Sequence, residues 1–196
     1  MNKQRGNYMK MNGNKGFTLI EVIVVAGIIA ILAGILVPMI IKEIDASRAS
    51  RASADARSIM TAVMVFKKDT GQWPVLDGAC NPTVTLVKGD GNQPGGLAAK
   101  GFDLTTQSSY NDSLAADTGS CFGSKWKGPY MAAVSPDPWG NSYVTNVDVS
   151  ATPPAPVWVL SAGPNGTIDT DASSSQVAGD DIGIIIQPAT PQPLIL

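Results

Sequence analysis

The sequence contains no histidine and few charges, and each shortage removes a class of function. Without histidine, the chain has neither a histidine base for catalysis nor a histidine ligand for zinc. Charged residues make up 15% of the chain, and the formal net charge is −2. This balance provides no basic surface for nucleic acid, so we predict no nucleic-acid partner. No nucleophile–base pair or phosphate-binding loop is evident either, and we predict that the protein is not an enzyme.

Cysteine is also scarce, because only Cys80 and Cys121 are present. Both follow the apolar segment described next, in the part of the chain that would be exported. A disulfide between them would close a loop of roughly 40 residues and contribute a few kcal/mol to stability. Two free thiols are the alternative.

The longest apolar run covers residues 17–41 and carries a single charge, Glu21. It is long enough to span a hydrocarbon core of roughly 30 Å. The first 16 residues hold four basic residues and no acidic one. A basic stretch before an apolar segment tends to stay on the cytoplasmic side, so we expect a single-pass protein whose remaining residues lie outside the cytoplasm.

The small residue Gly16 precedes the apolar run, whereas an ordinary secretory signal is cleaved after a shorter apolar core of about 7–15 residues. The nearest Ala-x-Ala patterns lie well beyond the run, in a charged stretch. Cleavage after Gly16 would leave the apolar helix on the mature chain. Phe17 would then be the new N-terminus and Glu21 its fifth residue. A plain membrane anchor with a tolerated acid is the alternative.

The sequence KGFTLIE (residues 15–21) resembles the class III leader junction of type IV pilins and type II secretion pseudopilins. Pro38, at the twenty-second mature position, is also typical of these families. The resemblance implies that prepilin peptidase removes residues 1–16 as a leader peptide and methylates the new amine of Phe17. It also implies that Glu21 meets the N-terminal amine of a neighbouring subunit, which compensates a carboxylate that costs about 2.5–3.5 kcal/mol in a bilayer.

Residues 17–41 are therefore predicted to form the transmembrane and polymerisation helix, and residues 42–70 an amphipathic continuation. Apolar residues in this second part recur at helical spacing, at Ala52, Ala56, Ile59, Val63 and Phe66. Their stripe would pack on the globular head, and Gly71 would end the helix. Pro38 removes one helical hydrogen bond and is expected to kink or locally melt the helix.

Residues 71–196 are predicted to form the globular head, with a variable loop over 71–127 and a proline-rich, extended tail over 184–196. The loop has room for one short helix, capped by Asp112 or Ser113. Three β-rich runs, GPYMAAVS, NSYVTNVDV and APVWVLSAG, predict a β-meander over 128–161. The bulky side chains expected in its core are Tyr130, Trp139, Tyr143 and Trp158. The predicted fold class is α+β and pilin-like, with a long N-terminal helix packed on a small antiparallel sheet.

Residues 162–183 are rich in oxygen-bearing side chains, which suit a hard cation such as calcium. A solvated acidic loop is the alternative. The runs DPWGNSY, LSAGPNG and DDIG resemble the C-terminal half of the major pseudopilin of type II secretion, in which this loop binds calcium. The resemblance implies ligands at Asp180 and Asp181, with Asn165 in place of an aspartate, so one negative charge is lost. By the same analogy, the backbone carbonyls near Ala162 and Thr167 complete the shell. Asp169 and Asp171 are candidates to replace the lost charge.

The function that the resemblance implies is that of a structural subunit, which polymerises into a periplasmic pseudopilus and drives type II protein secretion. The alternative is a type IV pilin for adhesion, twitching motility or DNA uptake, and a membrane-anchored exported enzyme is the least favoured class. The implied partners are further copies of the chain in a homopolymer, minor pseudopilins or pilins, prepilin peptidase and the inner-membrane assembly platform. The implied location is the bacterial inner membrane and then a periplasmic or extracellular filament.

Overall fold

The structure is a computed structural model that describes residues 16–76, 79–80, 85–147 and 155–187. It divides into two compact units, Met1–Ile44 and Asp45–Leu196, and each is described by itself. One helix, α1 (Leu19–Thr70), contributes residues to both units. The leader before Gly16 and most of the proline-rich tail, both predicted from the sequence, lie outside the described residues.

Thr18 starts helix α1 in the first unit. Its carbonyl oxygen accepts hydrogen bonds from the N–H groups of Glu21 (3.1 Å) and Val22 (3.3 Å), and its hydroxyl lies 3.4 Å from the Glu21 nitrogen. Threonine followed three residues later by glutamate is the capping-box pattern, and an acid in the first turn also suits the helix dipole. The helix continues through Pro38, so the local melting that we expected there is absent. The loss of one backbone hydrogen bond does not end a helix of this length.

In the first unit, the apolar residues of α1 are exposed on every face of the helix. Ile20 is 71% exposed and Ile35 is 67% exposed. By length and composition, α1 is able to cross a membrane. A helix that is apolar on every face requires lipid or other helices around it, since water would leave that surface unfavourably hydrated.

In the second unit, α1 packs one stripe of its surface against the head. The five residues that the sequence placed on this stripe, from Ala52 to Phe66, are each at most 1% exposed, which confirms the prediction. The helix ends at Thr70, where Gly71 takes a positive φ of 78° and donates its N–H to the Lys67 carbonyl at 2.9 Å. Glycine accepts this backbone conformation without a steric penalty, so the predicted stop is also confirmed.

Five strands form one sheet among the described residues, in the order β2-β1-β3-β4-β5. The β1–β2 pair is parallel and the other three pairs are antiparallel. The strands are β1 (Leu86–Lys88), β2 (Gln107–Ser109), β3 (Val144–Asn146), β4 (Val157–Ser161) and β5 (Ile182–Gln187). Short 3₁₀ helices are η1 (Ala98–Lys100), η2 (Tyr110–Asp112), η3 (Thr118–Ser120) and η4 (Gly123–Lys125). A long helix packed on a mostly antiparallel sheet confirms the predicted α+β, pilin-like fold class.

The positions of the strands differ from the predicted meander. The run GPYMAAVS forms no strand, because Pro129 lacks an N–H and Tyr130 donates its own to the Leu114 carbonyl at 2.8 Å. Strands β1 and β2 lie instead in the segment predicted as a variable loop. Strand β5 spans the boundary between the predicted calcium loop and the tail. The predicted short helix is the 3₁₀ turn η2, and its cap is Ser109, whose hydroxyl accepts the Asn111 N–H at 3.1 Å.

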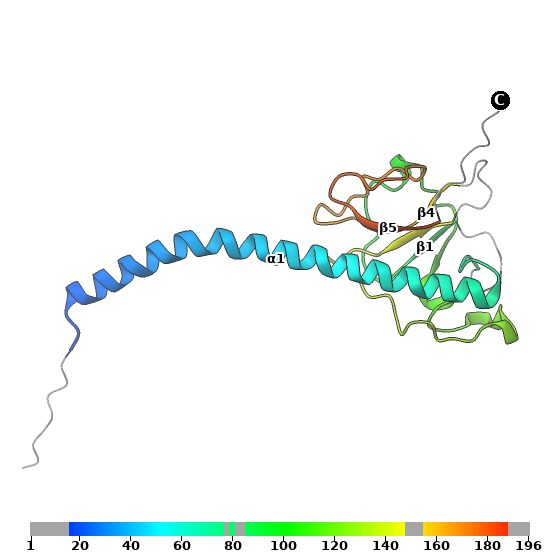
Figure 1. The fold of residues 1–196 in the computed structure, drawn as a ribbon, viewed down its shortest axis with the longest axis horizontal. Helices are drawn as coiled ribbons and strands as arrows, with labels where there is room; N and C mark the ends of the chain where they lie inside the picture. The colour runs from blue at the N-terminus through cyan, green and yellow to red at the C-terminus, as the bar shows by residue number, and fades with distance from the viewer. Residues whose placement is uncertain (1–15, 77–78, 81–84, 148–154, 188–196) are drawn as a thin grey trace, which may run out of the picture. The chain divides into compact units, whose positions relative to one another are not determined.

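The core has two parts, one on each face of the sheet. The part beneath α1 centres on Phe66, whose ring meets Phe122 and Tyr130 edge to face at centroid distances of 4.8 and 5.5 Å. The second part, on the other face, holds Trp158, Leu160 and Ile168 with residues from the 97–104 segment. In Figure 1 the head part of α1 runs along one face of the sheet, and the 162–181 loop (orange to red) lies at the opposite face. Ile168 therefore anchors that loop to the sheet.

Two of the four aromatic residues predicted for the core are fully buried. Tyr143 is 1% exposed and Trp158 is 2% exposed, whereas Tyr130 and Trp139 are only partly buried. The two cysteines are joined in a disulfide with an S–S distance of 2.12 Å and a sequence separation of 41. The disulfide links the segment after α1 to the turn that carries Phe122.

Candidate functional sites

Glu21 lies on an otherwise apolar face of the first unit. It lines one hollow with Phe17, Val22, Val25, Ala26 and Ile29. Among the described residues, no basic side chain forms an ion pair with Glu21. A carboxylate in apolar surroundings is costly unless a cation lies beside it. The geometry of this unit therefore leaves room for a positively charged partner from outside it.

Three carboxylates gather in the 162–181 loop, which connects β4 to β5. Asp169, Asp180 and Asp181 each bring one oxygen within 4.8 Å of the other two. Glycines permit this close approach. A Cβ on Gly179, which has a positive φ of 63°, would lie 2.2 Å from an Asp169 carboxylate oxygen, and one on Gly163 would lie 2.1 Å from the Asp180 carbonyl oxygen. Any larger residue at either position would push the acids apart.

Asp181 is the buried member of this acidic cluster, and it is only 8% exposed. Its Oδ2 accepts hydrogen bonds from the N–H groups of Asp169 (2.9 Å) and Thr170 (2.7 Å). Its Oδ1 is buried and has no hydrogen-bond partner among the described residues. Burial raises the pKa of Asp181, although its hydrogen bonds act in the opposite direction. A buried carboxylate oxygen without a donor is destabilising, and a cation is one way to satisfy it.

Asn165 lies at the edge of the acidic cluster. Its backbone N–H donates to Asp180 Oδ2 at 3.1 Å, and its side-chain Nδ2 donates to Asp169 Oδ2 at 3.1 Å. Its Oδ1 accepts the Thr167 N–H at 2.6 Å. The amide nitrogen of Asn165, and not its oxygen, therefore faces the carboxylate of Asp169.

The structure distinguishes between the two acids that the sequence offered as replacements for the missing charge. Asp169 joins Asp180 and Asp181, whereas Asp171 lies 4.0 Å from the Lys100 ammonium and outside the cluster. Ala162 is fully buried at the start of the loop. The roles of Ala162 and Thr167 as carbonyl ligands stay predictions. The three carboxylates offer only oxygen atoms as ligands. Oxygen ligands are the kind that a hard cation such as calcium prefers.

A second segment supports the acidic loop, and little in the sequence connects the two. Gly95 donates its N–H to the Gly166 carbonyl at 3.0 Å and accepts the Ile168 N–H at 2.9 Å. Further along, the Lys100 carbonyl accepts the Ala172 N–H at 2.9 Å. The only signal in the sequence was the Gly95-Gly96 pair. A Cβ on Gly96 would lie 2.6 Å from the Ile168 carbonyl oxygen, so this contact requires glycine.

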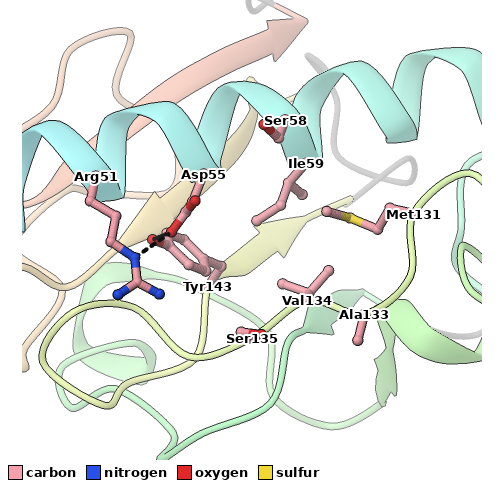
Figure 2. A pocket seen from close by; sticks show the side chains of 9 residues that line it. All are labelled: Arg51, Asp55, Ser58, Ile59, Met131, Ala133, Val134, Ser135 and Tyr143. Carbon is pink, nitrogen blue, oxygen red and sulfur yellow. Dashed lines mark hydrogen bonds and ion pairs between the residues drawn. The ribbon is translucent and has the colours of Figure 1, made fainter.

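A hollow of about 150 Å³ lies between α1 and the loop before β3. Figure 2 shows the side chains that line it. Tyr143 donates its hydroxyl hydrogen to Asp55 Oδ2 at 3.2 Å, and Arg51 Nε lies 3.6 Å from the same oxygen. The other lining residues are Ser58, Ile59, Met131, Ala133, Val134 and Ser135. Burial and the neighbouring Asp55 carboxylate raise the pKa of Tyr143. The Asp55 carboxylate is thus engaged by its two neighbours, and we assign these contacts to packing of the helix on the sheet.

Two family models match the chain. Residues 11–37 match the prokaryotic N-terminal methylation motif, and residues 103–180 match type II secretion system protein G. No solved structure matches the chain.

The curated proteins similar to this chain include three that are named type II secretion system core protein G. The protein of Pseudomonas aeruginosa is 26% identical over 136 residues, which cover 69% of this chain and 75% of the relative. The Escherichia coli K12 protein is 28% identical over 157 residues, or 80% of this chain and 86% of the relative. The Vibrio cholerae protein is 27% identical over 176 residues, which cover 89% of this chain and 90% of the relative.

The methylation motif, the apolar helix and the helix-on-sheet head together define the class, and the chain is similar to the type IV pilin-like family. Within that class, residues 103–180 match the domain of type II secretion protein G, the major pseudopilin, and the similar curated proteins carry the same name. The resemblance inferred from KGFTLIE and DPWGNSY is thereby confirmed, and the alternative of a type IV pilin is not favoured. The matched domain begins at residue 103, so the similarity extends further into the predicted variable loop than the sequence motifs indicated.

Proposed function

We propose that this chain is the structural subunit of a periplasmic pseudopilus that drives type II protein secretion. The observation that carries the proposal is the presence, in one chain, of the N-terminal methylation motif and the protein G domain. Three relatives that bear the protein G name are covered over 75–90% of their length, so the similarity extends beyond the shared N-terminal helix. Such a subunit acts by assembling, and its role is structural and not enzymatic.

Processing of the N-terminus fits this role. The methylation motif covers residues 11–37 and therefore includes the Gly16–Phe17 junction. Prepilin peptidase would cut after Gly16 and methylate the amine of Phe17. The basic residues before the junction favour the cytoplasmic side of the inner membrane for it, and the head would then lie outside the cytoplasm.

Assembly would occur through the apolar helix. Its exposed side chains would be covered by further copies of the chain, by minor pseudopilins and by the inner-membrane assembly platform. Glu21 has no basic partner among the described residues, and a methylated Phe17 amine from a neighbouring copy would supply one. Pro38 belongs to the same contact surface.

Substitution of Glu21 tests this assignment. Glu21→Ala and Glu21→Gln are expected to insert into the membrane, since a costly charge is removed, but to form few filaments. Glu21→Gln also preserves the capping-box pattern with Thr18, so a defect in this variant would not come from a lost helix start. Filaments are counted by shearing and electron microscopy, and insertion is measured by membrane fractionation. Glu43→Gln, which removes an exposed acid beyond the apolar run, is the matched control. A normal filament yield from both Glu21 variants would refute the pairing.

We also propose that the acidic loop binds one calcium ion through Asp169, Asp180 and Asp181. Asn165 and the carbonyls of Ala162 and Thr167 would lie next to the ion. The support is the unpartnered, buried Oδ1 of Asp181 together with two further carboxylate oxygens within 4.8 Å. The bound ion would offset most of the repulsion among three like charges. These residues would hold the 162–181 loop against the sheet.

Thermal unfolding of the full chain in detergent tests calcium binding. At a calcium concentration of a hundred times Kd, binding to the folded state alone adds about 2.7 kcal/mol to the free energy of unfolding. For a chain of this size that corresponds to an increase in Tm of about 5–11 °C over a chelator. Magnesium should substitute poorly, because it requires tighter octahedral geometry. Asp181→Asn should abolish the increase, and the control Asp171→Asn should retain it. Equal Tm values in calcium and chelator would show that the loop is only acidic.

A further inference from the structure

The contacts of Asn165 suggest how this chain controls its acidic cluster. The three carboxylates hold oxygens within 4.8 Å of one another, so they repel strongly unless donors or a cation face them. Two of them receive backbone donors: Asp181 from two N–H groups and Asp180 from the Asn165 N–H. For the Asp169 carboxylate, the described residues supply one donor, the Asn165 side-chain Nδ2 at 3.1 Å.

We propose that the Asn165 side-chain amide substitutes for a cation at Asp169, so that the acidic loop keeps its fold without calcium and depends less on the ion. A hydrogen bond to a charged acceptor is stronger than one between neutral groups, so the amide lowers the repulsion that a cation would otherwise have to remove. The inference rests on the proposed calcium site, and it concerns how strongly that site requires its ion.

The isosteric change Asn165→Asp isolates this effect. The new carboxylate keeps an oxygen to accept the Thr167 N–H, which now bonds Asn165 Oδ1 at 2.6 Å. Its second oxygen replaces the amide nitrogen at 3.1 Å from Asp169 Oδ2 and turns an attraction into a repulsion between like charges. In the presence of calcium, the same oxygen is a fourth carboxylate ligand. The substitution should therefore destabilise the loop without calcium and strengthen calcium binding, two effects of opposite sign.

The experiment compares four forms of the full chain in detergent: wild type, Asn165→Asp, the double variant Asn165→Asp with Asp169→Asn, and the control Asp171→Asn. Tm is measured in chelator, and Kd for calcium is measured by calorimetric titration. We expect Asn165→Asp to lower Tm in chelator by about 2–6 °C and to tighten Kd about tenfold or more. In the double variant, one amide again faces one carboxylate. We therefore expect its Tm in chelator and its Kd for calcium to return toward the wild-type values. Asp171, which lies beside Lys100 and outside the cluster, should affect neither.

The outcomes separate this inference from the calcium proposal. An unchanged Tm of Asn165→Asp in chelator, or an equal loss of Tm in calcium and in chelator, would overturn the inference, since the amide would then have no role or only a structural one. Failure of the double variant to recover Tm in chelator would overturn it as well. If wild type shows no calcium response while Asn165→Asp loses stability in chelator and gains such a response, the calcium proposal fails for the native chain and the inference holds.

Discussion

Loss of the Cys80–Cys121 disulfide should destabilise the head substantially. The two cysteines are 41 residues apart, and the loop-entropy relation for a closed loop of that size gives about 4 kcal/mol at 25 °C. For a chain of this length, about 4 kcal/mol corresponds to a decrease in Tm of about 8–16 °C. The position of the bond supports a large effect. Cys121 precedes Phe122, whose ring packs on Phe66 of α1 at a centroid distance of 4.8 Å, so the bond lies next to the core.

The assay is thermal unfolding of the full chain in detergent, with and without a reductant, followed by circular dichroism. The double variant Cys80→Ser with Cys121→Ser should melt at the temperature of the reduced wild type, and the reductant should not lower its Tm further. A thiol titration establishes that the wild-type bond has been reduced. If complete reduction shifts Tm by less than about 2 °C, the entropy argument is wrong for this loop, and its 41-residue span must be restrained by other contacts.

Two further predictions concern processing and alkaline stability. Mass spectrometry of the native protein should find the mature N-terminus at Phe17, carrying one methyl group; an N-terminus at Asp55 or Arg57, after an Ala-x-Ala pattern, would refute cleavage at Gly16. Burial raises the pKa of Tyr110 and Tyr143 above the ordinary value of about 10, so the unfolded chain loses these protons first and stability falls as pH rises above that value. Tyrosinate absorbance should show both groups titrating only as the circular dichroism signal is lost, and a reversible titration near pH 10 in the folded protein would contradict this.

The helix and the assembly motif could be predicted from the sequence because their signals are local. The apolar stripe from Ala52 to Phe66 follows the helical period, and Gly71 marks its end by backbone conformation alone. Gly16 and Glu21 are recognisable from their fixed spacing around the start of the apolar run. None of these features depends on a contact with a distant part of the chain.

The strands of the head could not be predicted in the same way. Strands β1 and β2 are only three residues long, and they exist because β1 pairs with β3 from more than fifty residues away. In contrast, GPYMAAVS has β-forming residues but donates its Tyr130 N–H to a loop. In both segments, contacts with distant parts of the chain determine whether a strand forms, as is common for short strands. Strand β5, with its four isoleucines, was the one element that composition alone should have revealed.

The assignment of the ion site depends on which buried acid is left unsatisfied, and the sequence cannot show this. Asp137 and Asp181 are both nearly buried, at 4% and 8% exposure. Both oxygens of Asp137 accept hydrogen bonds, from the Trp139 and Asn141 N–H groups and from the Ser161 hydroxyl at 2.6 Å. Asp137 therefore stabilises its own turn and has no oxygen to spare. Asp181 retains one oxygen without a donor, and in the part of the chain that the structure describes no other buried carboxylate oxygen does. The free oxygen, more than the number of acids in the loop, is the reason to propose Asp181 as the anchor of a cation.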